Sequence, residues 1–414
     1  MTLRLSILSA ATVFVYLLLI NVSLDRICSV FSEVQGYQCN DPNFSITILG
    51  CILLMLLALC IPILGRSYSA CLLWLMYYFH VVPSILVFSR LNGAAFEDFA
   101  IFSSLVFITY FFLVYASRIK VPVVELLYLK PGLNHLLLSA CVIFFVFFVV
   151  SNLGFNLNPP SIDDVYDVRA EYKSRVTPLV GYLAVLTGYF LSPVFVVLSV
   201  VYWDSRLKYK ALFFICVASF LSYLIYSSAG FKSVAFMPVV TLLSCLLFRK
   251  SENLGLLLNF LFLALLIFAW FLFIAFDLSI VLDHWVRRAL VVPGMTVAYF
   301  YDYSIGFGFD ANGSIPNLIS KTYFGTDGSA NAGFIGDGIA RYGVDLFWIN
   351  ILLLFLFVRL PELLLGKLDG PYIPALFIST AYALSNSSIT TVILTYGFLP
   401  LIIFVYFYKR VLVK

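Results

Sequence analysis

The chain has 414 residues, of which 63% are hydrophobic and 11% are charged. Soluble domains are about 45–50% apolar and about 25% charged, so this composition excludes an ordinary soluble protein. An aromatic content of 18% excludes a disordered chain, and a net charge of +4 leaves no basic surface of the size that nucleic-acid binding requires. The hydrophobic residues fall in long blocks, which predicts a polytopic membrane protein.

Twelve hydrophobic segments are long enough, or nearly so, to cross a bilayer. In chain order they are Leu5–Val22, Phe44–Leu64, Ala70–Ser89, Phe99–Ala116, Asn134–Leu153, Leu179–Tyr202, Ala211–Ser228, Val234–Phe248, Leu254–Phe276, Val344–Val358, Ile373–Leu384 and Val392–Tyr408. The two short ones, Val234–Phe248 and Ile373–Leu384, are half-spans, re-entrant segments or helices buried by their neighbours. The sequence therefore predicts an all-α transmembrane bundle of about twelve spans, forming a single membrane domain over residues 1–414.

The charged residues between the segments set the expected orientation. With both termini in the cytoplasm, that side holds 15 of the 25 basic residues and 5 of the 21 acidic residues. The other side then holds 10 basic and 16 acidic residues, which gives net charges of +10 inside and −6 outside, in agreement with the total of +4. Such a bias follows the positive-inside rule.

The cysteines and histidines indicate no metal site and no cofactor. Six of the eight cysteines lie in hydrophobic segments, whereas Cys28 and Cys39 share the first external loop. A disulfide between these two and a pair of free thiols are equally consistent with the sequence. The three histidines are far apart, and the chain contains no Cys-x-x-Cys motif.

Two external loops are longer than the others. The first, residues 154–178, carries Arg169, Lys173 and Arg175. The second, residues 277–343, is the longest hydrophilic stretch, and nine of the 23 glycines lie between Ser304 and Asp345. Long loops in compact proteins are usually functional or disordered, and the aromatic residues of the second loop favour function.

This concentration of polar residues on one side disfavours a transporter. The two halves of the chain show no internal similarity of the kind found in transporters of the major-facilitator type. Charged residues are also nearly absent from the hydrophobic segments, whereas ion-coupled transporters place carboxylates in the membrane. A site at the external boundary of the membrane fits the pattern better than a path through it.

Eight of the ten basic residues on the external side, where the positive-inside rule disfavours them, fall in the two long loops and in the turn at Lys232. They are Arg169, Lys173, Arg175, Lys232, Arg287, Arg288, Lys321 and Arg341. We expect them to bind an anion, of which the pyrophosphate of a lipid carrier is the best candidate, because a guanidinium group binds phosphate oxygens in pairs. The alternative is structural. Glu171–Arg175 and Asp283–Arg287 have the i,i+4 spacing of surface ion pairs, worth about 0.3–0.5 kcal/mol, and Arg287 and Arg288 also suit lipid headgroups.

Lys232 is the most informative of these residues. It follows Gly230 in a tight turn between two apolar segments and has no acidic residue nearby in the sequence. A lone cation in this position is costly unless a cavity or an anion compensates its charge. Tyr301 lies in an aromatic run, Tyr299–Tyr303, that suits either stacking on sugar rings or an interfacial aromatic belt.

In order and context, these features resemble the O-antigen polymerases, the Wzy family of oligosaccharide repeat-unit polymerases. The resemblance rests on four short motifs in chain order. They are Val168-Arg169-Ala170-Glu171-Tyr172, the Gly230-Phe231-Lys232 turn, Arg287-Arg288 with Pro293, and Gly333-Phe334-Ile335-Gly336-Asp337 followed by Tyr342-Gly343. Lys232 stands where the family more often has Arg, which removes bidentate geometry but keeps the charge.

The resemblance implies a membrane glycosyltransferase of the GT-C class in lipopolysaccharide biosynthesis. Such an enzyme acts at the periplasmic face of a bacterial inner membrane on undecaprenyl-pyrophosphate-linked oligosaccharides, and the family implies a partner protein that regulates chain length. The growing glycan leaves its lipid pyrophosphate and joins a fresh lipid-linked unit.

The residues suit this chemistry. Displacing pyrophosphate builds negative charge that preorganised Arg and Lys donors stabilise. The glycosyl pyrophosphate is already activated, and the chain has no Walker-type phosphate-binding motif. His284 and Asp337 are the candidates for a general base, with Asp302 and Asp283 as further choices, although any of these equally suits a hydrogen bond within a loop.

Two other functions fit the sequence less well. An O-antigen ligase uses the same lipid donor and differs in its acceptor, and the pairing of the Arg169 loop with the Gly230-Phe231-Lys232 turn favours the polymerase. A flippase of the same lipid-linked oligosaccharide requires charges through the membrane, which the apolar segments disfavour.

Overall fold

The computed structural model describes residues 2–34, 37, 43–90, 95–119, 140, 142–145, 147, 148, 150–152, 158–160, 164–307, 314–326, 328–366, 368 and 370–412. Within these ranges the chain is helical and contains no β-strand. Seven helical segments are long and apolar enough to cross a membrane. They are Leu3–Val30, Tyr68–Phe88, Phe96–Ser117, Pro178–Asp204, Lys208–Ala229, Leu254–Phe276 and Trp348–Leu365.

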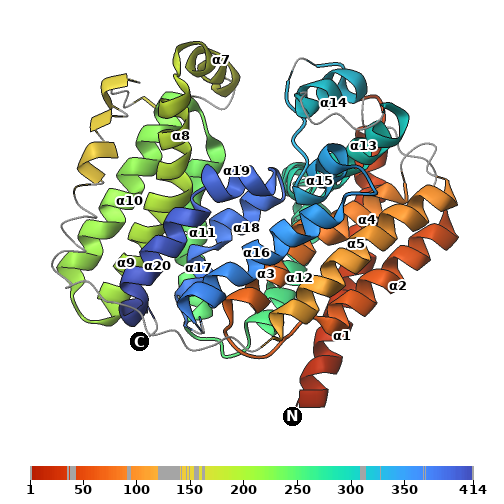
Figure 1. Cartoon of the computed structure of the whole chain (residues 1–414), viewed down its shortest axis with the longest axis horizontal. Coiled ribbons are helices and arrows are strands. Elements are labelled where there is room, and N and C mark those ends of the chain that lie inside the picture. Colours follow the sequence, from red (N-terminus) through yellow and green to blue (C-terminus); the bar gives the residue numbers. More distant parts are fainter. Residues whose placement is uncertain are drawn as a thin grey trace.

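Figure 1 shows how the helices are arranged in the bundle. The first half contains α1 (Thr2–Val30), α2 (Phe44–Cys60), α3 (Tyr68–Met76), η1 (Tyr77–Val81), α4 (Val82–Phe88), α5 (Phe96–Ser117), α7 (Val165–Arg175), α8 (Pro178–Leu186), η2 (Thr187–Leu191) and α9 (Ser192–Asp204). The second half contains α10 (Lys208–Ala229), α11 (Lys232–Phe248), α12 (Leu254–Phe276), η3 (Val281–Val291), α13 (Val292–Phe307), α14 (Ile315–Phe324), α15 (Phe334–Tyr342), α16 (Trp348–Leu365), α17 (Ile373–Leu376), α18 (Ile378–Leu384), α19 (Ile389–Leu394) and α20 (Phe398–Leu412).

The described helices overlap the predicted hydrophobic segments, although their ends differ, as between Leu5–Val22 and α1 (Thr2–Val30). Asn134–Leu153 lies largely outside the described residues. Leu254–Phe276 agrees at both ends, whereas Val392–Tyr408 is divided between α19 and α20. Residues 277–343, predicted as a loop, contain η3, α13, α14 and α15. Their aromatic and aliphatic side chains are frequent enough for each short helix to bury one face against the bundle.

Three π-helical segments share one sequence feature. A proline occupies the second position of the helix that follows each of them: Pro83 after η1, Pro193 after η2 and Pro293 after η3. A proline has no backbone N–H, so the carbonyl of the preceding turn loses its donor and the turn widens to i→i+5 hydrogen bonds. Prolines thus position these wide turns along the chain.

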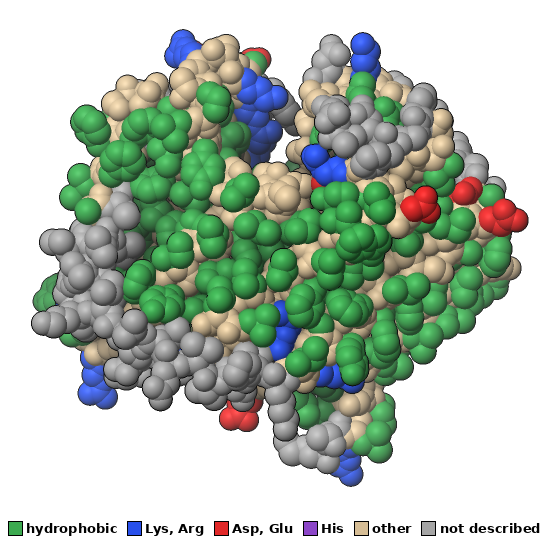
Figure 2. Space-filling model, in the orientation of Figure 1, with side chains coloured by type: hydrophobic (Ala, Val, Ile, Leu, Met, Phe, Trp, Pro, Cys, Tyr) green, Lys and Arg blue, Asp and Glu red, His purple; other side chains and the backbone are tan. Residues whose placement is uncertain are grey.

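The helices divide into a buried centre and an apolar exterior. In the Tyr68–Phe88 and Pro178–Asp204 segments 94% and 89% of the residues are buried, whereas in the equally apolar α1 and α12 the buried share is 33% and 28%. Leu18, Phe268 and Ile274 are among the exposed side chains of these outer helices. Hydrophobic side chains cover most of the face seen in Figure 2, with charged groups toward its two ends. A surface of this kind is stable in lipid and not in water, and the chain is a membrane protein.

One charged pair lies inside the bundle. Arg359 and Glu362 are both buried on α16 and form an ion pair, and Ser69 Oγ donates a hydrogen bond to Glu362 Oε1 at 3.1 Å. Arg359 also donates to the carbonyl oxygens of Ser117 and Ile119 at the end of α5. The charge is thus compensated on every side, which joins α3, α5 and α16 in the half of the bundle that carries the N-terminus.

The bundle has two distinct ends (Figure 1). The N-terminus of α1 and the end of α20 lie at one, which we call the terminal end. The opposite end carries α7 and α14, and we call it the α7 end. The predicted external basic residues belong to segments that reach the α7 end.

Candidate functional site

Helix α7 is held against the turn that joins α10 to α11. Arg169 Nε donates a hydrogen bond to the carbonyl oxygen of Gly230 at 3.1 Å, and the ring of Tyr172 packs edge-on against Phe231 with centroids 5.3 Å apart. Burial raises the pKa of Tyr172 to about 12. We call Arg169, Tyr172, Gly230, Phe231 and Lys232 the turn cluster. It brings together two segments that lie about sixty residues apart in the sequence.

Gly230 is required for this arrangement on two grounds. Its φ of +66° ends α10 in the left-handed region, where a side chain is strained. A Cβ at this position would also lie 3.1 Å from the carbonyl oxygen of Val165 and 3.3 Å from Cγ of Arg169. Glycine therefore allows both the turn and the close approach of α7.

Lys232 is the basic residue of the turn cluster that has no ion-pair partner among the described residues. It is the first residue of α11 and is half-buried, and the first turn of that helix contains no acidic residue. Among the described residues its side chain forms no ion pair or hydrogen bond. The N-terminus of a helix carries partial positive charge, which adds to the charge of Lys232. A basic side chain and a helix N-terminus therefore lie together at this turn, an arrangement that suits an anion.

The turn cluster is connected to the middle of the bundle through tyrosines. Tyr189 of η2 donates a hydrogen bond to Oγ of Ser233 at 3.1 Å, directly beside Lys232. The ring of Tyr189 packs edge-on against Tyr396 with centroids 4.7 Å apart. Ser379 of α18 donates to the carbonyl oxygen of Tyr189 at 2.8 Å. The segment from α18 to Tyr396 thus lies next to the turn cluster.

Helix α15 lies on the other side of this segment. A Cβ on Gly333, which precedes α15, would lie 2.6 Å from the carbonyl oxygen of Leu384 at the end of α18. On α15, Arg341 Nε and Asp337 Oδ2 form an ion pair at 2.8 Å. Burial raises the pKa of Asp337, and the Arg341 guanidinium partly opposes this shift. Asp337, a predicted general base, is therefore engaged by Arg341, another predicted site residue.

These contacts describe a hollow in the α7 end. Figure 2 shows a hollow between the parts of the surface that belong to α7 and to α14, with Lys or Arg side chains on both of its sides. The turn cluster forms one side, and α18 and α19 lie between it and α15. Lys232 belongs to the turn on that side, and no carboxylate of the described residues pairs with it.

The predicted basic residues of η3 belong to a different group. The guanidinium of Arg287 lies 4.1 Å from the ring centroid of Phe31 and 5.7 Å from that of Tyr37, and its buried Nε has no hydrogen-bond partner. Arg288 is exposed. Burial raises the pKa of Tyr37, and the charges of Arg287 and Arg288 lower it. The ring contacts of Arg287 are thus with the α1 side of the bundle and not with α7 or α11.

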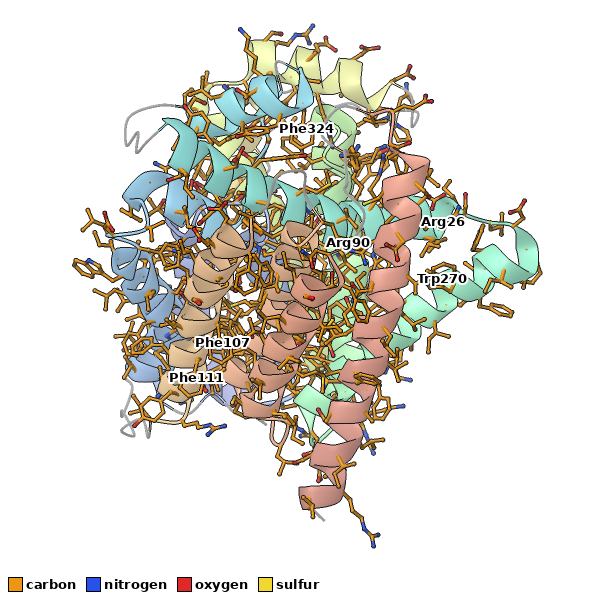
Figure 3. The ribbon with its side chains drawn as sticks, turned by 90° about the vertical axis from the view of Figure 1, so that its right-hand side faces the viewer. Arg26, Arg90, Phe107, Phe111, Trp270 and Phe324 are labelled. Carbon is orange, nitrogen blue, oxygen red and sulfur yellow. The ribbon has the colours of Figure 1, made fainter. Side chains whose placement is uncertain are left out.

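Beside Arg287, two ion pairs tie α1 to its neighbours. Arg26 is bidentate with Asp283, with both N–O distances at 3.0 Å, and its guanidinium lies 3.9 Å above the ring of Phe273. Arg90 pairs with Asp25 at the end of α4. We call Asp25, Arg26, Arg90 and Asp283 the α1 cluster; Figure 3 shows Arg26 and Arg90 on the side of the molecule where α1 lies. The predicted i,i+4 pair between Asp283 and Arg287 is not formed.

The π-helical geometry of η3 explains this difference. In an α-helix, residues four apart lie on one face, whereas i→i+5 hydrogen bonds shift that register. Asp283 consequently faces α1, and Arg287 faces Phe31 and Tyr37. The predicted pair between Glu171 and Arg175 on α7 does form, at an exposed position. Lys173 and Lys321 are exposed, and neither forms an ion pair within the described ranges.

Tyr301 does not have the predicted exposure. Its side chain is 2% exposed and packs edge-on against Phe88 and Phe102, so it offers no free ring face to a sugar. α13 turns this residue toward α4 because residues on its inner face must be apolar. Tyr299 stacks on Tyr323 of α14 at 4.4 Å instead, and Tyr323 donates a hydrogen bond to Asp302 at 2.6 Å.

Two further predictions concern residues at the edge of the described ranges. The backbone of His284 lies in η3, and its side chain lies outside what the structure describes. Cys28 is disulfide-bonded, and Cys39 lies outside the described residues. The described part of the chain contains no group of three His, Cys, Asp or Glu side chains able to hold a metal ion.

Cavities elsewhere are at the terminal end. One is lined by Ser6, Ser9 and the end of α2, and another by Ser199, Trp203 and Arg249. No family model, curated protein or solved structure matches the chain.

Several residues beside the hollow carried no recognised signal in the sequence. Tyr189, Ser233 and Tyr396 lie within or next to predicted spans, where hydroxyl groups are common. A stronger signal was available in residues 385–391, where six of seven side chains are Ser, Thr or Asn in an otherwise apolar segment. A polar run of this kind between two short membrane segments indicates backbone that lines a cavity.

Proposed function

We propose that the chain is a membrane glycosyltransferase that polymerises undecaprenyl-pyrophosphate-linked oligosaccharide repeat units into O-antigen or a related surface polysaccharide. One observation carries this proposal. Arg169 of α7 meets the Gly230–Lys232 turn at a hollow, and Lys232 has no acidic partner among the described residues. Both segments belong to the motif order that resembles the polymerases, and a cation without a counter-ion at a membrane boundary favours a phosphorylated ligand.

The proposal includes a topology. About twelve spans, a GT-C-like arrangement and cytoplasmic termini would place the α7 end at the periplasmic face of a bacterial inner membrane. The lipid tail of the donor would remain in the bilayer, and its pyrophosphate would reach the hollow at the membrane boundary. The apolar outer surface of the bundle is compatible with lateral entry of such a lipid.

The chemistry needs charge stabilisation and one proton transfer. When the acceptor hydroxyl attacks the anomeric carbon, the bond to pyrophosphate breaks and negative charge develops on the leaving oxygens. Lys232, positioned by α11, would stabilise that charge, and Arg169, held at Gly230, would orient the turn. Asp337 is a candidate to accept the hydroxyl proton, because its pKa is raised and it lies on α15 beside the hollow.

A genetic test distinguishes a polymerase from a ligase and from a flippase. Deleting the gene should leave core lipid that carries a single repeat unit, and the wild-type chain should restore the full ladder in gel electrophoresis. Lys232→Ala should fail to restore it at normal protein level, whereas Lys250→Ala, at the other end of α11, should restore it. Lipid-linked polymer with bare core would indicate a ligase, and single lipid-linked units retained in the cytoplasm would indicate a flippase. Either result would overturn the proposal.

A further inference from the structure

The segment from α18 to α19 has an unusual composition for its position in the bundle. Residues 373–408 contain no Lys, Arg, Asp or Glu. The turn between α18 and α19 is Ser385–Ser388, whose four side chains are all polar, and Thr390 and Thr391 extend this polar run into the first turn of α19. α17 and α18 together cover twelve positions, 373–384. At about 1.5 Å per residue they rise about 18 Å, which is less than the roughly 30 Å of a bilayer core.

The polar turn therefore lies at an intermediate depth, below α7 and α14 (Figure 1). Non-helical backbone at membrane depth is stable where it is packed in protein or lines a water-filled cavity. Asn386 and Ser387 are half-buried and Thr390 is exposed, so the turn is partly accessible. Uncharged surface lies at the bottom of the hollow in Figure 2. The turn thus forms the floor of the hollow.

Several hydrogen-bonding groups on this floor have no partner in the described part of the chain. Ser388 is satisfied, because it caps α19 and bonds to Thr391. The amide nitrogen of Asn386 donates to Ser385 at 2.9 Å, which leaves its carbonyl oxygen open. Among the residues that the structure describes, the hydroxyl groups of Ser387, Tyr382 and Tyr396 have no hydrogen-bond partner, and these three residues are half-buried. The floor therefore offers donors and acceptors together with two tyrosine rings.

We infer that Asn386 and Ser387 of this floor, together with Tyr382 and Tyr396 on either side of the turn, form a binding subsite for an uncharged sugar. Sugar rings present several hydroxyl groups and apolar C–H faces, which hydroxyl, amide and aromatic side chains match. An acidic sugar would find no cation between residues 373 and 408. Burying a carboxylate there would cost free energy, so the subsite selects a neutral ring.

The position of the subsite relates it to the phosphate site. Tyr396 packs on Tyr189, and Tyr189 is hydrogen-bonded to Ser233, the neighbour of Lys232. A ligand with a pyrophosphate at Lys232 would therefore place its adjacent sugars over the floor. This inference rests on the proposed function, because it assigns the floor to the glycan of a lipid-linked donor or acceptor.

The test measures sugar binding and phosphate binding separately. The full chain in lipid nanodiscs is titrated with two probes: single repeat units released from the surface polysaccharide of the source organism, and inorganic pyrophosphate. Asn386→Ala/Ser387→Ala and Tyr396→Phe should each weaken the binding of a neutral oligosaccharide about tenfold, at unchanged pyrophosphate binding. Lys232→Ala should show the reverse. Tyr406→Phe, the same substitution on α20 toward the terminal end, serves as the control and should alter neither.

The outcomes separate the two proposals. If folded floor variants bind the oligosaccharide as the wild type does, or if the wild type binds pyrophosphate and no oligosaccharide, the subsite is wrong and the proposed function stands. If the wild type binds oligosaccharide and no pyrophosphate, the proposed function fails and the subsite stands. Equal affinity for the oligosaccharide and for its uronic-acid form would overturn the selection of a neutral ring. Thermal unfolding of each variant identifies those that have lost their fold.

Discussion

The turn cluster and the α1 cluster use basic residues in opposite ways. In the α1 cluster, Arg26 and Arg90 each have a carboxylate partner, and the pairs join α1 to η3 and α4. In the turn cluster, Arg169 bonds to the backbone carbonyl of Gly230, and Lys232 has no acidic partner within the described part of the chain. Both groups stand near one end of the same bundle, and both contradict the positive-inside rule under the proposed topology.

The role of a basic residue on the side that the positive-inside rule disfavours depends on whether it has a carboxylate partner. A carboxylate at bonding distance turns the cation into a structural connection, whose loss should be measured as stability. A cation without a counter-ion is available for a ligand, and its loss should be measured as activity. Both clusters place basic side chains near the α7 end, so the presence or absence of a carboxylate partner decides whether a basic residue is structural or binds a ligand.

The largest effect should come from removing Lys232. Lys232→Ala should lower the rate of chain extension at least about 100-fold, because loss of one preorganised donor to a developing anion costs about 2.7–4 kcal/mol. Lys232→Arg keeps the charge and should retain most activity. Repeat-unit incorporation by purified protein, normalised to protein amount, measures both. Equal rates for Lys232→Ala and the wild type would remove the distinction between the clusters.

The α1 cluster should respond in stability. Asp283→Ala leaves Arg26 without its partner. Breaking a fully buried pair costs about 3–5 kcal/mol, and partial exposure of Arg26 should reduce this to about 2 kcal/mol. The side chain of Asp283 is 10% exposed and that of Arg26 is 23% exposed. Thermal unfolding in detergent gives the loss. The double variant Arg26→Met/Asp283→Leu should be more stable than Asp283→Ala; if it is less stable, the pair is not the source of the effect.

A substitution at Gly230 should show whether the turn between α10 and α11 fixes the position of α7. Gly230→Ala should destabilise the chain by about 1–2 kcal/mol through left-handed strain and displacement of α7. Gly65→Ala is the matched control, because Gly65 has a φ of +88° and no atom within 4 Å of its would-be Cβ. Limited proteolysis of α7 should increase in the Gly230 variant alone. Similar cleavage in both variants would show that the turn does not position α7.

The smallest effect concerns Asp337. Its pKa is raised in the folded chain, so folding favours the protonated form. The contribution to stability is therefore present below the unfolded pKa and is lost as pH rises through the folded value. Asp337→Asn should remove this pH dependence and change stability at neutral pH by less than about 1 kcal/mol. The difference in unfolding temperature between the wild type and Asp337→Asn, followed between pH 4 and pH 7, measures it; a difference that moves in favour of the wild type as pH rises would contradict the assignment. The same variant should lose activity if Asp337 accepts the hydroxyl proton.

Much of the fold could be predicted because hydrophobic length is a local property. Leu254–Phe276 matches α12 at both ends, since Asn253 and Asp277 end the apolar run. Arg169 and Lys232 could be assigned to one side of the membrane, although their meeting at Gly230 could not. Helix packing in lipid has little hydrophobic driving force, so hydropathy does not reveal which helices touch.

The failures have physical causes of the same kind. The structural alternative paired Asp283 with Arg287 by α-helical spacing, and a π-helical turn together with Arg26, 257 positions from Asp283, overrides that local rule. Tyr301 is buried by its contact with Phe88 and Phe102, which no local pattern encodes. The polar floor was missed because hydroxyl side chains give a weak signal unless their depth in the membrane is known.

Titration of the nanodisc-embedded chain with undecaprenyl pyrophosphate measures whether the turn cluster binds a phosphorylated lipid. The wild type should bind this lipid, and Lys232→Ala should bind it at least about tenfold more weakly, a loss of about 1.4 kcal/mol. Lys250→Ala should match the wild type. Equal affinity for all three chains, or no binding by the wild type, would show that the turn cluster does not hold a phosphorylated lipid.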